Sequence, residues 1–388
     1  MSDYVNTVII GGGIAGCSTA YFLGKSGIPS LILENEGIAS GASGYSAGGL
    51  NPLVGHGIPG LLGPMAMYSY EKHLSIWPEL AQETGIDFDG RIIDLLRVSF
   101  NEQDSLALAD TYETFNACNH PNFKATMMQT ADVLSQFPLV SDKIQNAVLA
   151  TGNAACDSYK LTLAFANAAE KSGAIFRSDE AIGLIREGDK VTGVQTRSGI
   201  IHCDSVVLAM GPWSINASEW IGMNIPVTPL KGQIIRLNYP EIQDYPDLEA
   251  PSLPEASIHP KPDGLIWCGA TKMEEMDEPF SSKSPTDHAR NTIMNKIMKV
   301  IPSLVNSELV LQTVCFRPVT EDWLPILGQV PNISNCYLAT GGGEKGVMLS
   351  SAIGEAIADL ITKGTTSVPI DDACVERLPM LLEESKRI

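Results

Sequence analysis

The first 34 residues combine apolar runs with a helical pattern, in an order that predicts a strand, a tight turn, a helix and a second strand. The apolar run at 8–10 ends in the glycine-rich turn 11–16, and the helical stretch that follows leads to a second apolar run ending at Glu34. Apolar runs of this length, bounded by glycine, are typical of strands buried on both faces. The pattern therefore predicts a βαβ unit almost at the start of the chain.

The turn carries the spacing of a dinucleotide-binding fingerprint. Gly11 permits the tight turn, Gly13 lets the backbone approach a pyrophosphate, and Gly16 lets the helix pack closely on the strand. Phosphates would meet the positive end of the helix dipole and the amides of Ile14 and Ala15. Glu34 follows about 20 residues on, where an acid bonds the adenosine ribose. The alternative is a βαβ unit without a ligand, and the turn alone does not separate FAD from NAD.

The rest of the chain predicts further helices and strands. Thr130 is a candidate N-cap, and Asp157 with Ser158 precedes the clearest amphipathic helix, which ends at Gly173. Helices are expected at 62–84, 103–117, 130–137, 159–172, 285–300 and 347–362, and strands at 91–100, in a β-meander over 174–211, in alternating segments within 226–275, and at 336–340.

These elements predict an α/β chain with two domains. A Rossmann-like nucleotide-binding domain is expected from three separated pieces, and a substrate domain on a mainly antiparallel sheet from two insertions. The predicted boundaries are 1–85, 150–222 and 312–388 for the first domain, and 86–149 and 223–311 for the second. Residues 36–60 are rich in Gly, Ala and Ser, which favours a loop in close contact with a bulky ligand over a plain linker.

Charge and composition limit the partners. The formal net charge of −19 argues against nucleic acid and anionic lipid, because those surfaces attract Lys and Arg. We find no signal-peptide pattern and no apolar run long enough to cross a membrane. The eight cysteines lack a CxxC pair, which favours reduced thiols and a cytoplasmic location, and the six histidines show no metal-binding spacing, so no metal is expected.

Seven segments, taken in order, resemble the D-amino acid oxidase (DAO) family of flavoenzymes, which includes glycine, D-amino acid and sarcosine oxidases. The resemblance covers most of the chain and favours FAD over NAD. The segments are the 11–34 unit, ASGASGYSAGG at 39–49, VVLAMGPWS at 206–214, PVTPLKGQI at 226–234, DGLIWCGAT at 263–271, FRPVTEDWLPILG at 316–328 and ATGGGEKGVMLSSAIGEAIADLI at 339–361.

The resemblance implies a set of cofactor-binding residues. Besides the N-terminal unit, they fall in the small-residue loop, in a strand near the adenine, after the apolar run 206–209, and in the C-terminal motifs. The implied residues are Gly11, Gly13, Ile14, Ala15, Gly16, Glu34, Ala42, Ser43, Gly48, Gly49, Leu50, Ala181, Ile182, Ala209, Gly211, Trp213, Cys315, Arg317, Gly343, Lys345, Gly346, Val347 and Met348.

Two charged residues have expected catalytic roles. Similar oxidases use the arginine of the RP motif, here Arg317, to hold the substrate carboxylate, which its planar fork matches. The alternative is a structural pairing with Glu321 or Asp322. Negative charge on the reduced flavin would face the N-terminus of the last helix, with Lys345 adding a full charge. The alternative for Lys345 is a solvated surface lysine.

FAD is expected to bind non-covalently, with attachment through Cys315 as the alternative. In monomeric sarcosine oxidases the cysteine at this position is joined to the flavin, whereas a buried, inert thiol is the common fate of a free cysteine.

Three departures from the family pattern bear on the substrate and the acceptor. Ser257 or His259 stands where glycine-oxidase-like members have a tyrosine, and Glu344 where they have an arginine. His259 is also a candidate base. No clear counterpart exists of the lysine that sarcosine oxidases use with oxygen, so oxygen and a quinone or other carrier both remain as acceptors.

The expected reaction is oxidation of a C–N bond of an amino acid or secondary amine. Hydride leaves the α-carbon for flavin N5, and the imine is hydrolysed. Three alternatives stay open: oxidation of a tRNA-borne carboxymethylaminomethyl group, oxidation of a hydroxy acid or glycerol phosphate, and a non-enzymatic flavin-bound subunit. The pattern indicates neither the substrate nor the oligomeric state.

Overall fold

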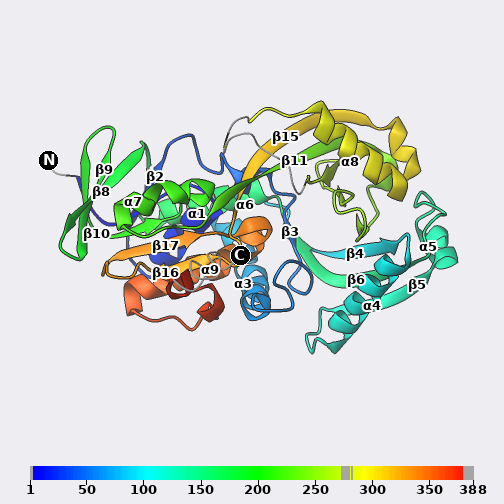
Figure 1. Cartoon of the computed structure of the whole chain (residues 1–388), viewed down its shortest axis with the longest axis horizontal. Helices are drawn as coiled ribbons and strands as arrows, with labels where there is room; N and C mark the ends of the chain where they lie inside the picture. The colour runs from blue at the N-terminus through cyan, green and yellow to red at the C-terminus, as the bar shows by residue number, and fades with distance from the viewer. Residues whose placement is uncertain (1–2, 272–279, 281–282, 379–388) are drawn as a thin grey trace, which may run out of the picture.

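The computed structural model describes residues 3–271, 280 and 283–378. It is an elongated molecule built on two sheets that lie side by side (Figure 1). The first, sheet A, has eight strands in the order β16-β17-β10-β1-β2-β7, with the hairpin β8–β9 attached to β10. Its strands are β1 (Asp3–Ile10), β2 (Ser30–Glu34), β7 (Ile175–Ser178), β8 (Ala181–Glu187), β9 (Lys190–Thr196), β10 (Ile200–Leu208), β16 (Ile326–Gln329) and β17 (Cys336–Thr340).

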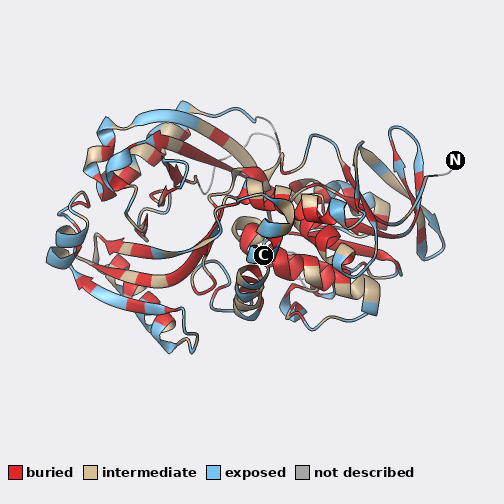
Figure 2. Ribbon diagram, turned by 180° about the vertical axis from the view of Figure 1, so that it is seen from behind, coloured by how far each residue is buried: buried red, intermediate tan, exposed pale blue. Residues whose placement is uncertain are grey.

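Both faces of sheet A are buried, which explains its continuous apolar strands. Strand β1 pairs in parallel with β2 and β10, and β10 pairs in parallel with β17. Since side chains alternate along a strand, Ile9 enters the core beneath the helices, whereas Val8 and Ile10 enter the core on the opposite face. Figure 2 shows these central strands buried along most of their length.

Four long helices cover one face of sheet A and pack on one another. They are α1 (Ile14–Lys25), α3 (Gly63–Thr84), α6 (Ser158–Lys171) and α9 (Gly346–Lys363). Helices α1 and α9 meet at Gly354, where an added Cβ would lie 2.6 Å from the carbonyl carbon of Ser18. Only a glycine lets the two backbones approach this closely.

Sheet B has nine strands and is mainly antiparallel, in the order β15-β11-β14-β13-β12-β4-β6-β3 with β5 paired to β6. Its strands are β3 (Gly49–Leu50), β4 (Arg91–Ser99), β5 (Lys124–Gln129), β6 (Asn146–Ala155), β11 (Thr228–Asn238), β12 (Asp247–Glu249), β13 (Ile258–Pro260), β14 (Leu265–Gly269) and β15 (Glu308–Val319). Helices α4 (Glu102–Ala117), α5 (Thr130–Gln136) and α8 (Asp287–Val300) pack on it. The short helix α2 (Ala42–Tyr45) contacts α6 and β15, and α7 (Ser218–Ile221) contacts β8.

The structure confirms the α/β class, the two-sheet architecture and the predicted helices, including the Asp157 cap, whose side chain accepts from the amide of Lys160 at 3.0 Å. Two predictions were wrong. Thr130 is the first residue of α5 rather than its cap, because its hydroxyl donates to the carbonyl of Ile144. The segment 175–178 is not part of the meander: it follows helix α6 and pairs in parallel with β2, so only β8, β9 and β10 form the meander.

The domain boundaries stay a prediction. Strands β3, β6 and β15 belong to sheet B, although their residues fall partly or wholly in the ranges assigned to the nucleotide-binding domain.

Candidate active site

A cavity of about 910 Å³ opens at the carboxyl ends of the parallel strands of sheet A and continues against one face of sheet B. Ile10, Glu34, Ala209 and Thr340, which end or follow β1, β2, β10 and β17, all line it. Ligands of open α/β sheets bind at this edge, where the turns leave the strands. The cavity is therefore the candidate active site.

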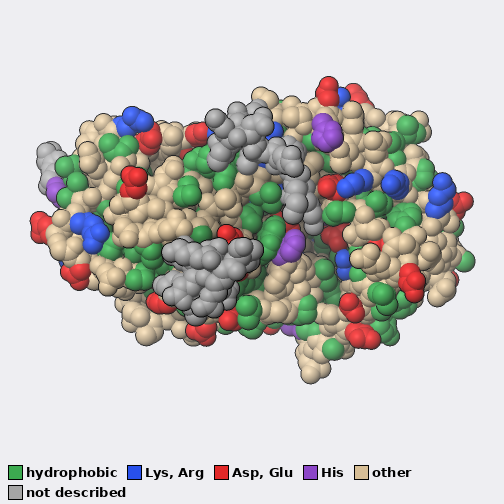
Figure 3. Space-filling view, viewed as in Figure 1, with side chains coloured by type: hydrophobic (Ala, Val, Ile, Leu, Met, Phe, Trp, Pro, Cys, Tyr) green, Lys and Arg blue, Asp and Glu red, His purple; other side chains and the backbone are tan. Residues whose placement is uncertain are grey.

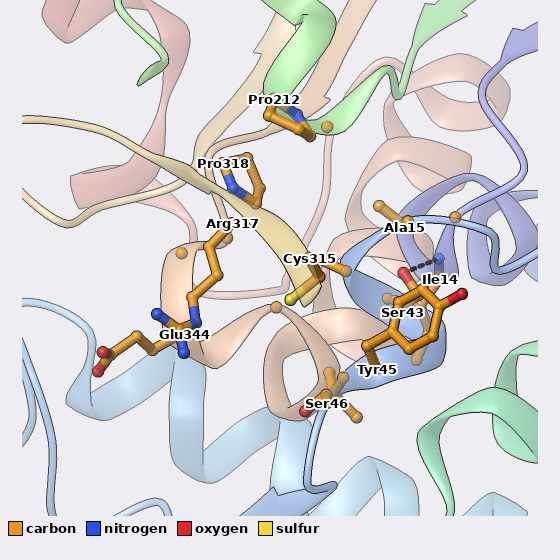
Figure 4. Close-up of a pocket in the computed structure, with 18 of the residues that line it drawn as sticks. Ile14, Ala15, Ser43, Tyr45, Ser46, Pro212, Cys315, Arg317, Pro318 and Glu344 are labelled. Atoms are coloured by element: carbon orange, nitrogen blue, oxygen red, sulfur yellow. Dashed lines mark hydrogen bonds between the residues drawn. The ribbon is translucent and has the colours of Figure 1, made fainter. Parts of the chain in front are cut away.

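The glycine turn fits the close approach expected of it. Gly11 has φ +115°, and an added Cβ there would lie 2.3 Å from the carbonyl oxygen of Ala209. At Gly16 a Cβ would lie 2.1 Å from the carbonyl oxygen of Gly11. The amide of Ile14 donates to the hydroxyl of Ser43 at 2.9 Å (Figure 4). This bond joins the start of α1 to the small-residue loop across the cavity.

Glu34 lies at the end of β2 with its carboxylate held in place by backbone amides. One oxygen accepts from the amide of Gly12 at 2.7 Å and the other from Glu36 at 2.8 Å. The side chain is only half-buried and lines the cavity. The amide of Gly37 also donates to this carboxylate, at 3.3 Å. An ionised carboxylate has about four acceptor sites, so about one remains for a ligand hydroxyl.

The C-terminal turn reaches the cavity through Gly343, Glu344, Lys345 and the start of α9. The ammonium of Lys345 donates to the carbonyl of Val54 at 2.9 Å. Glu344 lies 3.3 Å from Nδ1 of His56. These contacts tie the turn to the loop that precedes α3, so the Lys345 ammonium is bound to backbone within the cavity wall instead of extending into solvent.

Arg317 and Cys315 project from β15 into the cavity. The Arg317 side chain extends toward Glu344, whereas Cys315 lies on the side of the loop that carries Ser43, Tyr45 and Ser46 (Figure 4). The guanidinium of Arg317 donates to the carbonyl of Thr271 at 3.1 Å. It lies over Gly232, where an added Cβ would be 2.5 Å from its nearest nitrogen.

Arg317 does not make the structural pairing considered above. Asp322 instead pairs with Arg377 at 2.9 Å and accepts from the amide of Leu324 at 3.0 Å, which fixes its loop. Within the described residues no carboxylate forms an ion pair with Arg317. The guanidinium thus keeps donors for a ligand. Burial raises the pKa of the neighbouring Cys315 thiol, although Arg317 acts in the opposite direction.

His259 lines the cavity from β13, with Nδ1 2.5 Å from the carboxylate of Asp247. Burial alone would raise the pKa of Asp247, but His259 and Lys261 together hold it below its usual range. Burial also lowers the pKa of Lys261, whose ammonium donates to the carbonyl of Ala47. The three groups form a buried cluster that ties sheet B to the small-residue loop.

Most of the residues expected from sequence come together in this cavity. Gly16, Leu50 and Met348 do not line it. Gly16 serves the packing of α1 against the turn, while Leu50 and Met348 are core side chains, each 1% exposed.

Eight charged or aromatic lining residues were not anticipated: Glu36, Tyr45, His56, Arg97, Asp179, Glu180, Trp220 and Glu249. Tyr45 and His56 stand in the small-residue loop, where large polar side chains are conspicuous. Arg97 lies in a strand otherwise rich in apolar residues.

Within the described part of the chain, no helix is long and apolar enough to cross a membrane. Among the same residues, no three His, Cys, Asp or Glu side chains are grouped to hold a metal ion. All eight cysteines are free thiols.

Known proteins resemble this chain over nearly its whole length. A family model described as FAD dependent oxidoreductase (DAO) matches residues 6–360. Glycine oxidase of Pseudomonas aeruginosa is 25% identical over 364 residues, which cover 93% of this chain and 95% of that protein. The formaldehyde-forming 4-methylaminobutanoate oxidase of Paenarthrobacter nicotinovorans is 27% identical, over 97% of this chain and 46% of its own length. The structure of glycine oxidase from Bacillus cereus matches with a TM-score of 0.85 and 26% identity, over 95% of this chain and 97% of that one.

Proposed function

The chain belongs to the DAO family of FAD dependent oxidoreductases, and we propose from this premise how its cavity residues act. It is an FAD-dependent enzyme of the group that oxidises C–N bonds in amino acids and amines. We propose that Arg317 binds the carboxylate of an amino acid substrate. This contact presents the C–H bond of the substrate's α-carbon to the flavin ring.

The observation that carries the proposal is the state of Arg317. Its side chain faces the cavity, is anchored through the Thr271 carbonyl, and has no ion pair among the described residues. A half-buried cation without a counter-ion is costly unless a ligand supplies the charge. A carboxylate fits the guanidinium fork bidentately, which fixes the orientation as well as the position of the substrate.

The described residues fit FAD. The cavity is long enough to pass from Glu34 and Ala181 at one end, along the start of α1, to the start of α9. We propose that the amides of α1 and the Ser43 hydroxyl hold the pyrophosphate, that Glu34 holds the ribose, and that Ala181, Ile182, Ala209, Gly211 and Trp213 flank the adenosine half. When bound, FAD accepts the hydride and so supplies the redox chemistry.

The start of α9 and Lys345 supply positive charge at the opposite end of the cavity. We propose that this charge stabilises the electron-rich ring that results from oxidation of substrate. Cavity side chains orient the neutral amine, and its lone pair assists departure of the hydride. His259 is held by Asp247, so we assign it to positioning of the cavity wall in preference to proton removal.

The test is anaerobic reduction of the purified yellow protein. Addition of a panel of D- and L-amino acids and N-methyl amines is expected to bleach the flavin band with at least one of them. Failure of every amine and amino acid would contradict the proposal. Bleaching by a hydroxy acid alone would favour the second candidate, C–O oxidation, which Arg317 serves equally well because the carboxylate is the same. Repeating the successful reaction in air separates oxygen from a quinone or other carrier as acceptor.

A tRNA substrate is the weaker alternative. Figure 3 shows acidic and basic side chains interspersed on the face in view, and the chain carries a net charge of −19. Binding of tRNA relies on clustered Lys and Arg. We infer a small-molecule substrate and, from the reduced thiols, a cytoplasmic location.

Replacement of Glu34 by glutamine is expected to weaken FAD binding about tenfold. A neutral amide replaces a charge-assisted hydrogen bond to the ribose, at a cost of about 1.4 kcal/mol. Fluorescence titration of the apoprotein with FAD measures the change. Glu79→Gln, on the exposed part of α3 where Glu79 pairs with Lys25, is the matched control and should leave the affinity unchanged. Equal affinities for the wild type and Glu34→Gln would rule out the ribose contact.

Acid denaturation is expected to release the flavin into the supernatant. Partial burial raises the pKa of the Cys315 thiol, which disfavours the thiolate that a covalent link requires. A Cys315→Ser variant should therefore release the same fraction of FAD as the wild type. A yellow protein pellet from the wild type and a colourless one from the variant would establish covalent attachment instead.

A further inference from the structure

The cavity extends past the flavin-facing residues over a row of positions that crosses sheet B. Ile234 of β11 pairs with Gly269 of β14, and the amide of Gly269 donates to the carbonyl of Ser257 at 3.0 Å. The pairing of Leu248 with Ile258 places Glu249 of β12 beside Ser257, and Glu249 is in register with Arg97 of β4. All five members of this row line the cavity.

The row is open in its middle. Gly269 has no side chain and Ser257 has a small one. The part of sheet B between β11 and β12 therefore forms a flat floor of the cavity, with no large side chain rising from it. Three strand spacings separate these two strands, a distance of about 14 Å at the backbone. Arg317 lies over Gly232, also on β11, at one end of this floor, and Glu249 lies at the other. A ligand as small as glycine, held by Arg317, would leave the far end unfilled.

At the far end of the floor, the carboxylate of Glu249 is more accessible to a ligand than the guanidinium of Arg97. The Arg97 side chain is 12% exposed and that of Glu249 34% exposed. Arg97 directs Nη1 to the hydroxyl of Thr111, while its buried Nε has no hydrogen-bond partner and lies 3.6 Å from Glu249. The pair is therefore loose: Arg97 partly offsets the charge of Glu249, and the carboxylate, which is the more exposed of the two groups, keeps acceptor sites for a ligand.

We propose that Glu249 is a specificity-determining residue that binds a cationic group at the far end of the substrate. The inference rests on the proposed function, since it takes Arg317 as the site of the carboxylate. The substrate class it defines is an amino acid whose side chain ends in an ammonium or guanidinium group. The carboxylate of such a molecule contacts Arg317, its aliphatic part crosses the floor formed by Gly269 and Ser257, and its terminal nitrogen donates to Glu249.

The test uses the FAD-loaded enzyme and three amino acids of similar length. Lysine has a cationic end, norleucine an uncharged end, and 2-aminoadipate an anionic end, each in both D- and L-forms. Rates of anaerobic flavin bleaching give kcat/KM for each. We expect the wild type to prefer lysine over norleucine by at least tenfold, because a charge-assisted hydrogen bond contributes about 1.5–3 kcal/mol. Glu249→Gln should reduce that preference about tenfold and leave norleucine within twofold of the wild type.

Glu308→Gln, at the exposed start of β15, removes the same charge from sheet B away from the cavity and should change neither substrate. Equal losses for lysine and norleucine in Glu249→Gln would overturn the proposal, as would a wild-type preference for norleucine, 2-aminoadipate or glycine. If Glu249→Gln does not retain yellow colour, the wild-type ratio of lysine to norleucine decides alone. If no amino acid or amine bleaches the wild type, the proposed function fails as well, whereas bleaching without a preference for lysine overturns this inference only.

Discussion

Replacing Arg317 with alanine is expected to lower kcat/KM for the amino acid substrate by about 100- to 10,000-fold. The variant loses two charge-assisted hydrogen bonds to the carboxylate, each contributing about 1.5–3 kcal/mol. It also loses the alignment that brings the α-carbon to the flavin, so kcat should fall together with the rise in KM. Steady-state or anaerobic reduction kinetics on the FAD-loaded variant measure both parameters.

Two further variants make this result specific. Arg317→Lys keeps the charge but not the planar fork, and should recover only part of the activity. Arg290→Ala removes an arginine from the exposed surface of α8, where it pairs with Asp287, and should be silent. An Arg317→Ala enzyme that stays yellow and keeps its wild-type kcat/KM would refute the assigned role.

Protonation of His73 is expected to destabilise the protein by about 3 kcal/mol between pH 6.5 and pH 4. Burial lowers the pKa of this fully buried imidazole to about 4, although the carbonyls of Val347 and Met348 act in the opposite direction. The unfolded chain takes up a proton near pH 6.5 and the folded chain does not. The stabilisation is therefore fully present above pH 6.5 and is lost as the pH falls through 4.

The surroundings of His73 show why the neutral form is kept. The indole of Trp77 can only donate, and it donates to Nδ1 at 3.1 Å, so Nδ1 must be the unprotonated nitrogen. Nε2 then carries the hydrogen and donates to the carbonyl of Val347 at 3.2 Å. The imidazole joins α3 to the first turn of α9, at the end of the cavity assigned to the flavin ring.

Urea unfolding of the holoprotein at pH 6.5 and pH 4 measures the effect. His73→Gln cannot titrate, so its free energy of unfolding should depend less on pH than that of the wild type, by about 3 kcal/mol over this range. The exposed His202, changed to glutamine, is the control for loss of a histidine as such. Identical pH dependence in His73→Gln and the wild type would contradict the prediction.

The sequence correctly predicted those elements in which the local conformational preference of the residues matches the structure that the rest of the fold imposes. The unit at 11–34 was predictable because glycine spacing, apolar runs and the terminal acid each serve one local geometry. Strand β6 was not, since its sequence NAVLATGNAA is rich in Ala, Asn and Gly, which favour strands weakly. Its conformation comes from pairing with β4 on one side and β5 on the other, contacts that no local window contains.

The residues of the candidate site also fall into those that local sequence predicted and those that it did not. Residues within contiguous motifs, such as Ser43, Lys345 and Arg317, were predicted because one segment carries the whole signal, and all three line the cavity. Arg97 and Glu249 were not, because their adjacency depends on the register of β4 with β12. Leu50 and Met348 were also expected at the cofactor because they stand in these motifs. Their side chains turn inward to the core, and their contact with the cofactor stays a prediction.

The glycine contact between α1 and α9 fixes the distance between the two ends of the proposed cofactor site. In the proposed arrangement α1 begins beneath the phosphates and α9 beneath the reacting ring. The two helices pack at Gly354, where no larger residue fits. The separation of the two anchoring points is thus set by interior backbone instead of by adaptable loops. A mononucleotide can contact only one of these two points. The fixed distance between them therefore selects a ligand with the full length of a dinucleotide.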